Sequence, residues 1–223
     1  MLKIINTADG SNSLYNDIIN ESYHSVNGAI QESQHVFINA GLSQFSKKEI
    51  SIFEVGFGTG LNALLSYIFA ENNSKKIIYN SIELFPLKRE LYAQLNYANI
   101  LGQNYSHIYL KINESQWNTN INISDYFSLN KIHDDIRTVE LSGKYDLVYF
   151  DAFSPQVEPE LWTYEIFEKL YSSMNMNSIF VTYCAKGDVR RNLQKAGFNV
   201  ERIPGPAGKR EMLRALKATS FKL

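Results

Sequence analysis

Cysteine is almost absent from this sequence. The 223 residues include one cysteine, Cys184, which excludes an internal disulfide and a zinc site built from several thiolates. Histidines are also few, four in all, and His24 and His35 are too isolated along the chain to indicate metal ligands. We therefore expect a cytoplasmic protein, in a reducing compartment, that uses no metal ion.

Long hydrophobic runs are missing as well. No uninterrupted apolar stretch approaches the roughly 18 residues that a membrane-spanning helix needs. Residues 1–6 lack the long apolar stretch and the cleavage site of a signal peptide. Hydrophobic residues still make up 44% of the chain and charged residues 20%, which is enough apolar material for a full core. Disorder is therefore excluded as the general state, and we expect a folded protein with no membrane contact.

A net charge of −1 hides an uneven distribution of charge. Residues 184–223 contain ten Lys and Arg and three acids, so this segment carries +7 and the remainder of the chain −8. Such a basic segment favours contact with a polyanion. A solvated basic helix followed by a basic strand explains the same charge equally well.

Strand-like and helix-like segments alternate along most of the chain. Apolar runs predict strands at residues 51–55, 76–82, 127–132, 145–150 and 178–183. Helical spacing and helix-boundary residues predict helices at 61–70, 86–97, 159–174 and 188–196. Two closing strands, 198–203 and 211–218, are typical of an antiparallel hairpin. This order indicates an α/β fold with a mostly parallel sheet and an antiparallel C-terminal edge.

The first 45 residues show little regular periodicity. Turn-forming residues such as Asp9 and Gly10 alternate there with short apolar stretches. We therefore expect residues 1–45 to form a small N-terminal extension or lid, and residues 46–223 to form the main domain.

A glycine-rich turn follows the first predicted strand. Gly56, Gly58 and Gly60 lie within five residues, and Glu54 stands two residues before the first of them. Glycine lets the backbone approach a ligand closely, and the start of the following helix offers free N–H groups. The spacing departs from the fingerprint of dinucleotide-binding proteins, because Leu61 stands where the third glycine would fall. It resembles the first motif of class I methyltransferases, which bind S-adenosylmethionine.

Acidic residues follow the next two predicted strands. Glu83 comes after residues 76–82, and Asp134 and Asp135 come after residues 127–132. Ligands of open α/β sheets bind at the carboxyl ends of the strands. We therefore expect Glu83 to accept hydrogen bonds from ribose hydroxyls and Asp135 to accept one from an adenine amino group. The alternatives are a helix-capping acid at Glu83 and a solvated acidic turn at Asp135.

Asp151 directly follows the most hydrophobic strand and begins the segment Asp-Ala-Phe-Ser-Pro. A charged side chain at the end of a buried strand needs a reason. An aspartate at the catalytic edge of the sheet can orient a nucleophilic amine and accept charge from it, and Phe153 can wall in a planar substrate group. The alternative is an Asx-type turn with Phe153 in the core.

Together these segments resemble the methyltransferase domain of the bacterial tRNA 5-methylaminomethyl-2-thiouridine biosynthesis proteins, the MnmC type. The matching segments are residues 23–37, 54–62, 83–87, 151–155, 159–163, 189–198 and 208–213. The resemblance therefore spans nearly the whole chain. The glycine turn alone would indicate only a methyltransferase, whereas its combination with the later segments is much more selective.

This resemblance implies methyl transfer from S-adenosylmethionine to the primary amine of 5-aminomethyl(-2-thio)uridine at the wobble position of tRNA. It implies a set of cofactor contacts, namely Glu54, Gly56, Gly58, Gly60, Asn62, Glu83, Asp135 and Asp151. Asp151 and Phe153 fall on the active-site loop of the family and are the implied catalytic residues. Tyr23 and Glu32, from the N-terminal segment, are implied to close over the cofactor or the substrate.

The implied partner is the anticodon stem-loop of tRNA. We expect the basic C-terminal segment to contact the tRNA. The best candidates for this contact are Lys186, Arg190, Arg191, Lys209 and Arg210. Arginine forks suit phosphate geometry, and phosphate contacts position a nucleic acid without reading its sequence. For each residue the alternative is a solvated surface side chain. Bifunctional members of the family continue into an FAD-dependent oxidase domain, so we expect other enzymes to supply the aminomethyl group here.

Two other functions remain open. The same fold serves methyltransferases of small amines and aminopropyltransferases, but the segment after Asp151 lacks the paired acids that usually hold a polyamine. The positive charge of residues 184–223 also does not favour binding of a cationic substrate. A methyltransferase-like scaffold that binds RNA or protein without turnover is the third possibility. The intact glycine turn, Glu83 and Asp151 argue against it.

Overall fold

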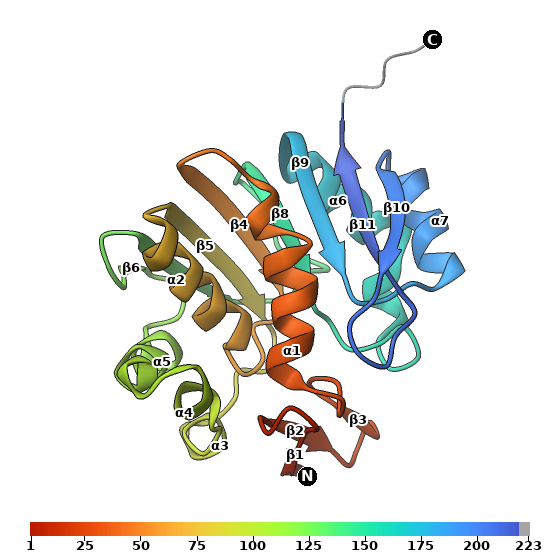
Figure 1. The fold of residues 1–223 in the computed structure, drawn as a ribbon. Helices are drawn as coiled ribbons and strands as arrows, with labels where there is room; N and C mark the ends of the chain where they lie inside the picture. The colour runs from red at the N-terminus through yellow and green to blue at the C-terminus, as the bar shows by residue number, and fades with distance from the viewer. Residues whose placement is uncertain (219–223) are drawn as a thin grey trace.

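An eight-stranded sheet forms the centre of the molecule, in the strand order β10-β11-β9-β8-β4-β5-β7-β6 (Figure 1). The structure is a computed structural model and describes residues 1–218. The strands are β4 (Glu49–Val55), β5 (Lys76–Glu83), β6 (Asn120–Asn122), β7 (Phe127–His133), β8 (Tyr145–Phe150), β9 (Met174–Thr182), β10 (Asn199–Pro204) and β11 (Glu211–Lys217).

The five middle strands, β9, β8, β4, β5 and β7, pair in parallel, whereas β6, β10 and β11 pair antiparallel. The predicted α/β sheet with an antiparallel C-terminal hairpin is therefore confirmed. Of the strands, β6 was not predicted, and its short polar sequence gives no apolar signal. Strand β9 begins at Met174, four residues before the predicted start.

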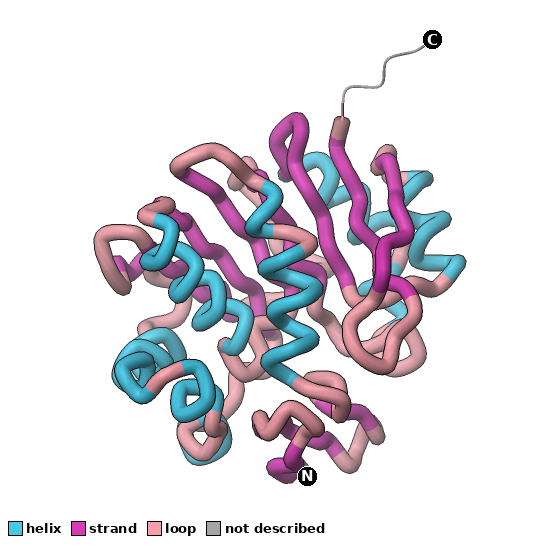
Figure 2. The backbone as a smooth tube through the Cα atoms, in the orientation of Figure 1, coloured by secondary structure: helices cyan, strands magenta, loops and turns pink. Residues whose placement is uncertain are grey.

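Helices cover both faces of the sheet, which explains why all six residues of β8 are buried (Figures 1 and 2). Helix α2 (Leu61–Asn73) covers one face, and α6 (Tyr164–Ser173) and α7 (Gly187–Lys195) cover the other. Successive residues of β4 divide between the two sides, so Ile52 belongs to one hydrophobic cluster and Phe53 to the other. This two-sided burial fixes the register of the central strands.

The prediction of one helix over residues 86–97 is wrong. The segment contains α3 (Arg89–Tyr92) and the start of α4 (Tyr97–Leu101), and it is followed by a short 3-10 turn (Gln103–Tyr105) and α5 (Ser106–Glu114). The helix is interrupted beside Asn96, whose side chain binds the N-terminal segment instead. Asn96 Oδ1 accepts the backbone N–H of Asn12 at 2.8 Å, and its Nδ2 donates to the carbonyl oxygen of Gly10 at 2.9 Å.

The predicted helix over residues 159–174 is also divided. A 3-10 turn spans Pro159–Trp162, and Thr163 is extended before α6 begins. The break allows the buried Trp162 ring to turn inward, where its Nε1 donates to the carbonyl oxygen of Phe153 at 2.8 Å. A tertiary contact therefore overrides the continuous helical pattern of the sequence.

The N-terminal residues carry more regular structure than the pattern predicts. Strands β1 (Leu2–Asn6), β2 (Asn12–Asn16) and β3 (Glu21–Ser22) form a separate antiparallel sheet beyond the carboxyl ends of the parallel strands (Figure 1). Helix α1 (Ala29–Ser33) continues as a π-helix (Gln34–Asn39), and a 3-10 turn follows (Leu42–Gln44). Val36 and Phe37 are buried in the main core. A domain boundary at residue 45 stays a prediction.

Within residues 1–218, none of the helices combines the length and the apolar character needed to cross a membrane.

Candidate active site

A cavity of about 730 Å³ lies at the carboxyl ends of β4, β5, β7 and β8. The N-terminal segment forms its opposite wall, through residues between Leu2 and Glu32. The cavity brings together ten of the predicted site residues, namely Tyr23, Glu32, Gly56, Gly58, Asn62, Glu83, Asp135, Asp151, Phe153 and Lys209. Segments more than one hundred residues apart in the sequence therefore meet at one site.

The glycine loop, residues 56–60, has left-handed backbone at each of its three glycines. At Gly56, with φ 90°, a Cβ atom would lie 2.7 Å from the carbonyl oxygen of Asp151, so glycine is required for the two strand ends to approach. Gly60 has φ 76° and caps the start of α2. It does not line the cavity, and its role is therefore to shape the turn.

Glu83 is held by the backbone on both of its carboxylate oxygens. Its Oε2 accepts the N–H of Gly58 at 3.0 Å, and its Oε1 accepts the N–H of Phe85 at 2.9 Å. A carboxylate has about four lone-pair sites, so Glu83 retains acceptor capacity toward the cavity. This fixed carboxylate beside the glycine loop suits a ligand with neighbouring hydroxyl groups.

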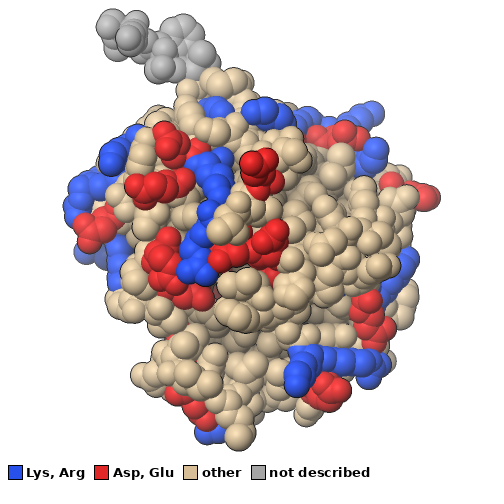
Figure 3. Space-filling model, turned by 180° about the vertical axis from the view of Figure 1, so that it is seen from behind, with Lys and Arg blue, Asp and Glu red and all other residues tan. Residues whose placement is uncertain are grey.

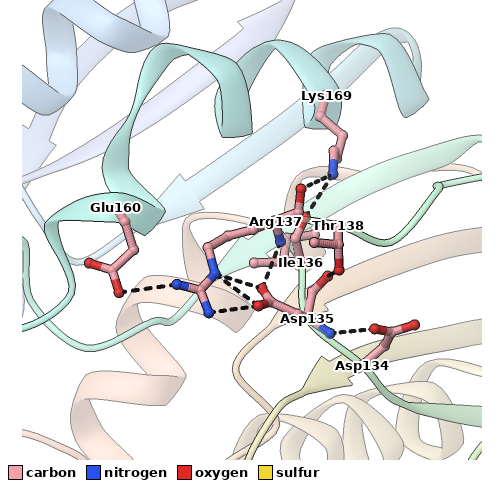
Figure 4. A network of polar contacts seen from close by, with 7 residues as sticks. All are labelled: Asp134, Asp135, Ile136, Arg137, Thr138, Glu160 and Lys169. Atoms are coloured by element: carbon pink, nitrogen blue, oxygen red, sulfur yellow. Dashed lines mark hydrogen bonds and ion pairs between the residues drawn. The ribbon is translucent and has the colours of Figure 1, made fainter.

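Asp135 lies on the cavity wall, but its carboxylate already has a partner. Arg137 Nε donates to both oxygens at 2.9 Å, and Arg137 Nη2 adds a contact of 2.6 Å (Figure 4). Arg137 also reaches Glu160 at 3.6 Å, while Lys169 binds the carbonyl oxygens of the 136–139 segment (Figure 4). These hydrogen bonds lower the pKa of Asp135, so it stays ionised at neutral pH. A ligand contact at Asp135 must share this carboxylate with Arg137.

Asp151 sits where β8 ends, and both its backbone and its side chain are fixed. Its N–H donates to the carbonyl oxygen of Val55 at 2.9 Å, and its Oδ2 accepts Asn62 Nδ2 at 2.8 Å. Burial, followed by the negative charges of Glu54 and Glu32, raises the pKa of Asp151 well above its usual range. An ionised Asp151 is therefore an unusually strong base for a carboxylate.

Glu54 is fully buried and does not reach the surface of the cavity. Its Oε1 accepts Asn62 Nδ2 at 3.0 Å, and its Oε2 accepts the hydroxyl of Ser81 at 2.6 Å. Burial raises the pKa of Glu54 to about 8. Asn62 therefore lies between Glu54 and the cavity, and the cofactor contact that the resemblance implies for Glu54 stays a prediction.

An aromatic pair walls the cavity beside Asp151. The rings of Tyr23 and Phe153 meet edge to face, with their centroids 5.0 Å apart. Glu21 fixes the segment after Phe153, because its carboxylate accepts the N–H of Ser154 at 3.0 Å and the Ser154 hydroxyl at 2.7 Å. Sequence reasoning missed Glu21, which lies 133 positions from Ser154 in a polar segment without a motif.

An ion pair ties the N-terminal helix to the C-terminal hairpin. Lys209 Nζ lies 2.6 Å from Glu32 Oε1, and Glu32 Oε2 accepts the N–H of Ser25 at 2.7 Å. The same ammonium group lies 3.9 Å from the centroid of the Tyr183 ring. Lys209 is thus engaged at the cavity wall, and a phosphate would have to compete with Glu32 for it.

The remaining predicted RNA-binding residues do not line the cavity. Lys186, Arg191 and Arg210 are exposed, and Arg190 is half-buried. Arg191 also pairs with Asp188. On the face shown in Figure 3, basic and acidic side chains are interspersed and do not form a broad area of one sign.

The cavity wall carries a clear excess of acidic residues. Eight acids line it, Glu21, Glu32, Glu83, Asp134, Asp135, Asp151, Glu158 and Glu160, against three basic residues, Lys88, Arg137 and Lys209. Burial, with Glu160 nearby, raises the pKa of Glu158 to about 7. Such a cavity favours a cationic ligand. Among residues 1–218 no group of three or more His, Cys, Asp or Glu is arranged to hold a metal ion.

Residues 90–218 match the family described as S-adenosyl-L-methionine-dependent methyltransferases. This match covers more than half of the chain. The chain belongs to this family. The matched range contains Asp135, Asp151 and Phe153 and begins after the glycine loop, which adds its own motif to the assignment. The cofactor of this methyltransferase is therefore S-adenosylmethionine.

Named relatives narrow the family further. The methyltransferase is 32% identical over 209 residues to the tRNA 5-methylaminomethyl-2-thiouridine biosynthesis bifunctional protein MnmC of Campylobacter hominis. It is 32% identical over 213 residues to the protein of the same name from Nitrosospira multiformis. These matches cover 91% and 90% of this chain but 31% and 34% of those relatives. The chain thus spans about a third of their length.

Solved structures agree with this relationship. A crystal structure of MNMC2 from Aquifex aeolicus superposes with a TM-score of 0.79 and 29% identity, over 97% of this chain and 70% of that one. Spermidine synthase from Thermotoga maritima shares the fold alone, with a TM-score of 0.58 and 11% identity over 96% of this chain and 67% of that one. The resemblance of the methyltransferase to the MnmC type is therefore confirmed.

The residues of the cavity fit S-adenosylmethionine. A volume of about 730 Å³ is within the usual range of cofactor pockets. Gly56 and Gly58 carry no side chain, so the backbone at these two positions of the turn can approach a ligand closely, and Glu83 offers carboxylate oxygens for the ribose hydroxyls. The excess of acids complements the positive charge of a sulfonium group.

Proposed function

We propose that this methyltransferase methylates the primary amine of 5-aminomethyl(-2-thio)uridine at the wobble position of tRNA. The observation that carries the proposal is the position of Asp151, which is half-buried at the cavity wall next to the aromatic pair of Tyr23 and Phe153. The relatives named for 5-methylaminomethyl-2-thiouridine biosynthesis support the same substrate.

The amine must be neutral to act as a nucleophile, because its lone pair forms the new bond. The bound cofactor supplies a methyl carbon on a sulfonium group, which leaves as a neutral thioether. Asp151 orients the amine and accepts its proton. Its raised pKa makes the ionised carboxylate a better proton acceptor than an ordinary aspartate. The fixed backbone of Asp151 holds this acceptor at one place in the cavity.

Tyr23 and Phe153 recognise the uracil ring. Aromatic side chains commonly hold a base that has been turned out of its stack. Trp162 and Glu21 hold the loop that carries Phe153 from two sides. The base therefore meets a rigid wall, and its aminomethyl group is directed toward Asp151.

The exposed basic residues contact the tRNA backbone. Lys186, Arg191 and Arg210 are free of the cavity, and charged residues of this kind position an RNA through its phosphates. Because the substrate amine must already be present, other enzymes that install the aminomethyl group act before this methyltransferase.

Mass spectrometry of wobble nucleosides tests the proposal. We expect tRNA from a strain that lacks the gene to accumulate the 5-aminomethyl nucleoside. Purified protein with S-adenosylmethionine should convert that tRNA to the 5-methylaminomethyl form. Normal nucleoside content in the deletion strain would contradict the proposal. Free amines tested in parallel would reveal a small-molecule methyltransferase, and decarboxylated S-adenosylmethionine with polyamines would reveal an aminopropyltransferase.

A further inference from the structure

Four side chains at and behind the cavity wall form a continuous hydrogen-bonded unit. The two N–H groups of Asn62 Nδ2 reach two carboxyl groups, Glu54 Oε1 at 3.0 Å and Asp151 Oδ2 at 2.8 Å. Ser81 continues the unit from Glu54 Oε2. Asn62 is 3% exposed and Glu54 is 0% exposed, so bulk water does not screen the two carboxyl groups from each other.

The orientation of the Asn62 amide follows from the two carboxyl groups. Its Oδ1 is buried and has no hydrogen-bond partner, which costs free energy for a buried acceptor. Turning the amide by 180° would face this oxygen toward the acceptor oxygens of Glu54 and Asp151. The two carboxyl groups therefore hold the Asn62 amide with its N–H groups toward them. Its carbonyl oxygen is left without a hydrogen bond from residues 1–218.

We propose that Glu54 is a positioning residue that fixes Asp151 through Asn62 and holds the proton of this carboxyl pair, so that Asp151 is the ionised member. The inference rests on the proposed function, in which Asp151 accepts the proton of the substrate amine. Both carboxyl groups have raised pKa values because of burial, and each charge disfavours the other. Their titrations are consequently coupled.

The surroundings decide which of the two carboxyl groups ionises. Asp151 borders the cavity and faces one cation, Lys209, together with Glu32 and the phenol of Tyr183. The positive sulfonium charge of a bound cofactor would add to Lys209 on the same side. These cations favour an ionised Asp151, and the charge of Glu32 opposes them.

Among residues 1–218, no cation faces Glu54. Asn62 and Ser81 are its hydrogen-bond partners, Tyr79 and Tyr149 lie near it, and Glu83 adds a like charge. A protonated Glu54 can donate to the Ser81 hydroxyl over the same 2.6 Å. The proton therefore resides on Glu54, one side chain away from the reaction.

Carbon-13 NMR titration of labelled Asp and Glu carboxyl groups, in protein without substrate, tests the inference. Asp151→Asn and Glu54→Gln assign the two signals. We expect the Asp151 signal to titrate below that of Glu54, and the Glu54 midpoint to fall by about one pH unit in Asp151→Asn, the effect of removing one neighbouring charge. A Glu54 signal that titrates first, or that is unmoved by Asp151→Asn, overturns the inference.

Substitutions at Asn62 and Glu54 test whether Glu54 positions Asp151 through the Asn62 amide. Asn62→Asp keeps the shape but replaces the two donors with a third carboxyl group, so we expect both midpoints to rise and kcat to fall about 100-fold. Glu54→Gln should reduce kcat less than Glu54→Ala, because the amide carbonyl still accepts from Asn62. Glu140→Gln, an exposed carboxyl outside the cavity, is the matched control.

Equal loss of kcat in Glu54→Gln and Glu54→Ala, with wild-type thermal stability in both, would also overturn the inference. The titration requires no methyl acceptor, so its result is independent of the substrate. If tRNA is not methylated but the two titrations are coupled as described, the proposed function alone fails. If tRNA is methylated and the titrations are independent, the inference alone fails.

Discussion

Asp151 and Asp135 follow parallel strands and line the same cavity, yet their environments are opposite. Asp151 is half-buried beside other carboxyl groups, and its pKa is raised. Asp135 is bound by the arginine two residues later, and its pKa is lowered. The position after a strand therefore sets where a carboxylate lies, while its neighbours decide whether it acts as a base or as a fixed anion.

The two environments also give opposite dependences of stability on pH. Asp135 stabilises the fold above its ordinary pKa, and this contribution is lost as pH falls. The contribution of a buried carboxyl with a raised pKa is present below its ordinary pKa and lost as pH rises through the folded-state value. Substitutions in the buried part of the site should therefore have different effects from substitutions in its exposed part.

Replacing Asp151 should have the largest effect. Asp151→Ala removes the proton acceptor at the cavity wall, so we expect methyl transfer to fall by about 10³-fold or more, while S-adenosylmethionine still binds. Methyl transfer measured with the 5-aminomethyl tRNA and calorimetry with the cofactor check the two halves of this prediction. Turnover close to wild type would remove Asp151 from the mechanism.

Glu54 should contribute to a loss of stability as the pH rises. Its pKa is about 8 in the folded protein against an ordinary 4.5, so stability declines as pH rises between these values. Relative to Glu54→Gln, we expect wild type to lose about 3 kcal/mol between about pH 6 and about pH 9. Urea unfolding of both proteins at the two pH values measures this. An equal loss of unfolding free energy in wild type and Glu54→Gln between the two pH values would show that Glu54 has an ordinary pKa.

Asp135 should matter less than Asp151, because Arg137 already occupies its carboxylate. We expect Asp135→Asn to weaken S-adenosylmethionine binding by about tenfold, the value of one hydrogen bond to a charged group, without changing the kcat of saturated enzyme. Arg137→Gln frees the same carboxylate and is the matched control. A loss of kcat in Asp135→Asn would place this residue nearer the reaction than its position indicates.

The parts of the site predicted from the sequence are those fixed by local backbone. The glycine loop, Glu83 and Asp151 follow strand ends, and a strand end is visible in the hydrophobic pattern. The contact of Glu21 with Ser154 and the interruption at Asn96 depend on segments that meet only in the folded chain. Glu54 was assigned to the cofactor because of its motif, but residue type and spacing do not reveal that Asn62 covers it.

The basic residues outside the cavity should show the smallest effect. Exposed charges are solvated and screened by salt, and Arg191 is already paired with Asp188. Replacing Arg190 and Arg191 together by Ala should weaken tRNA affinity and reduce the slope of log K against log salt by up to about two phosphate contacts. Cofactor affinity should not change, since neither side chain lines the cavity. An unchanged salt slope would assign tRNA binding to another surface, and Lys186→Ala with Arg210→Ala is then the informative pair.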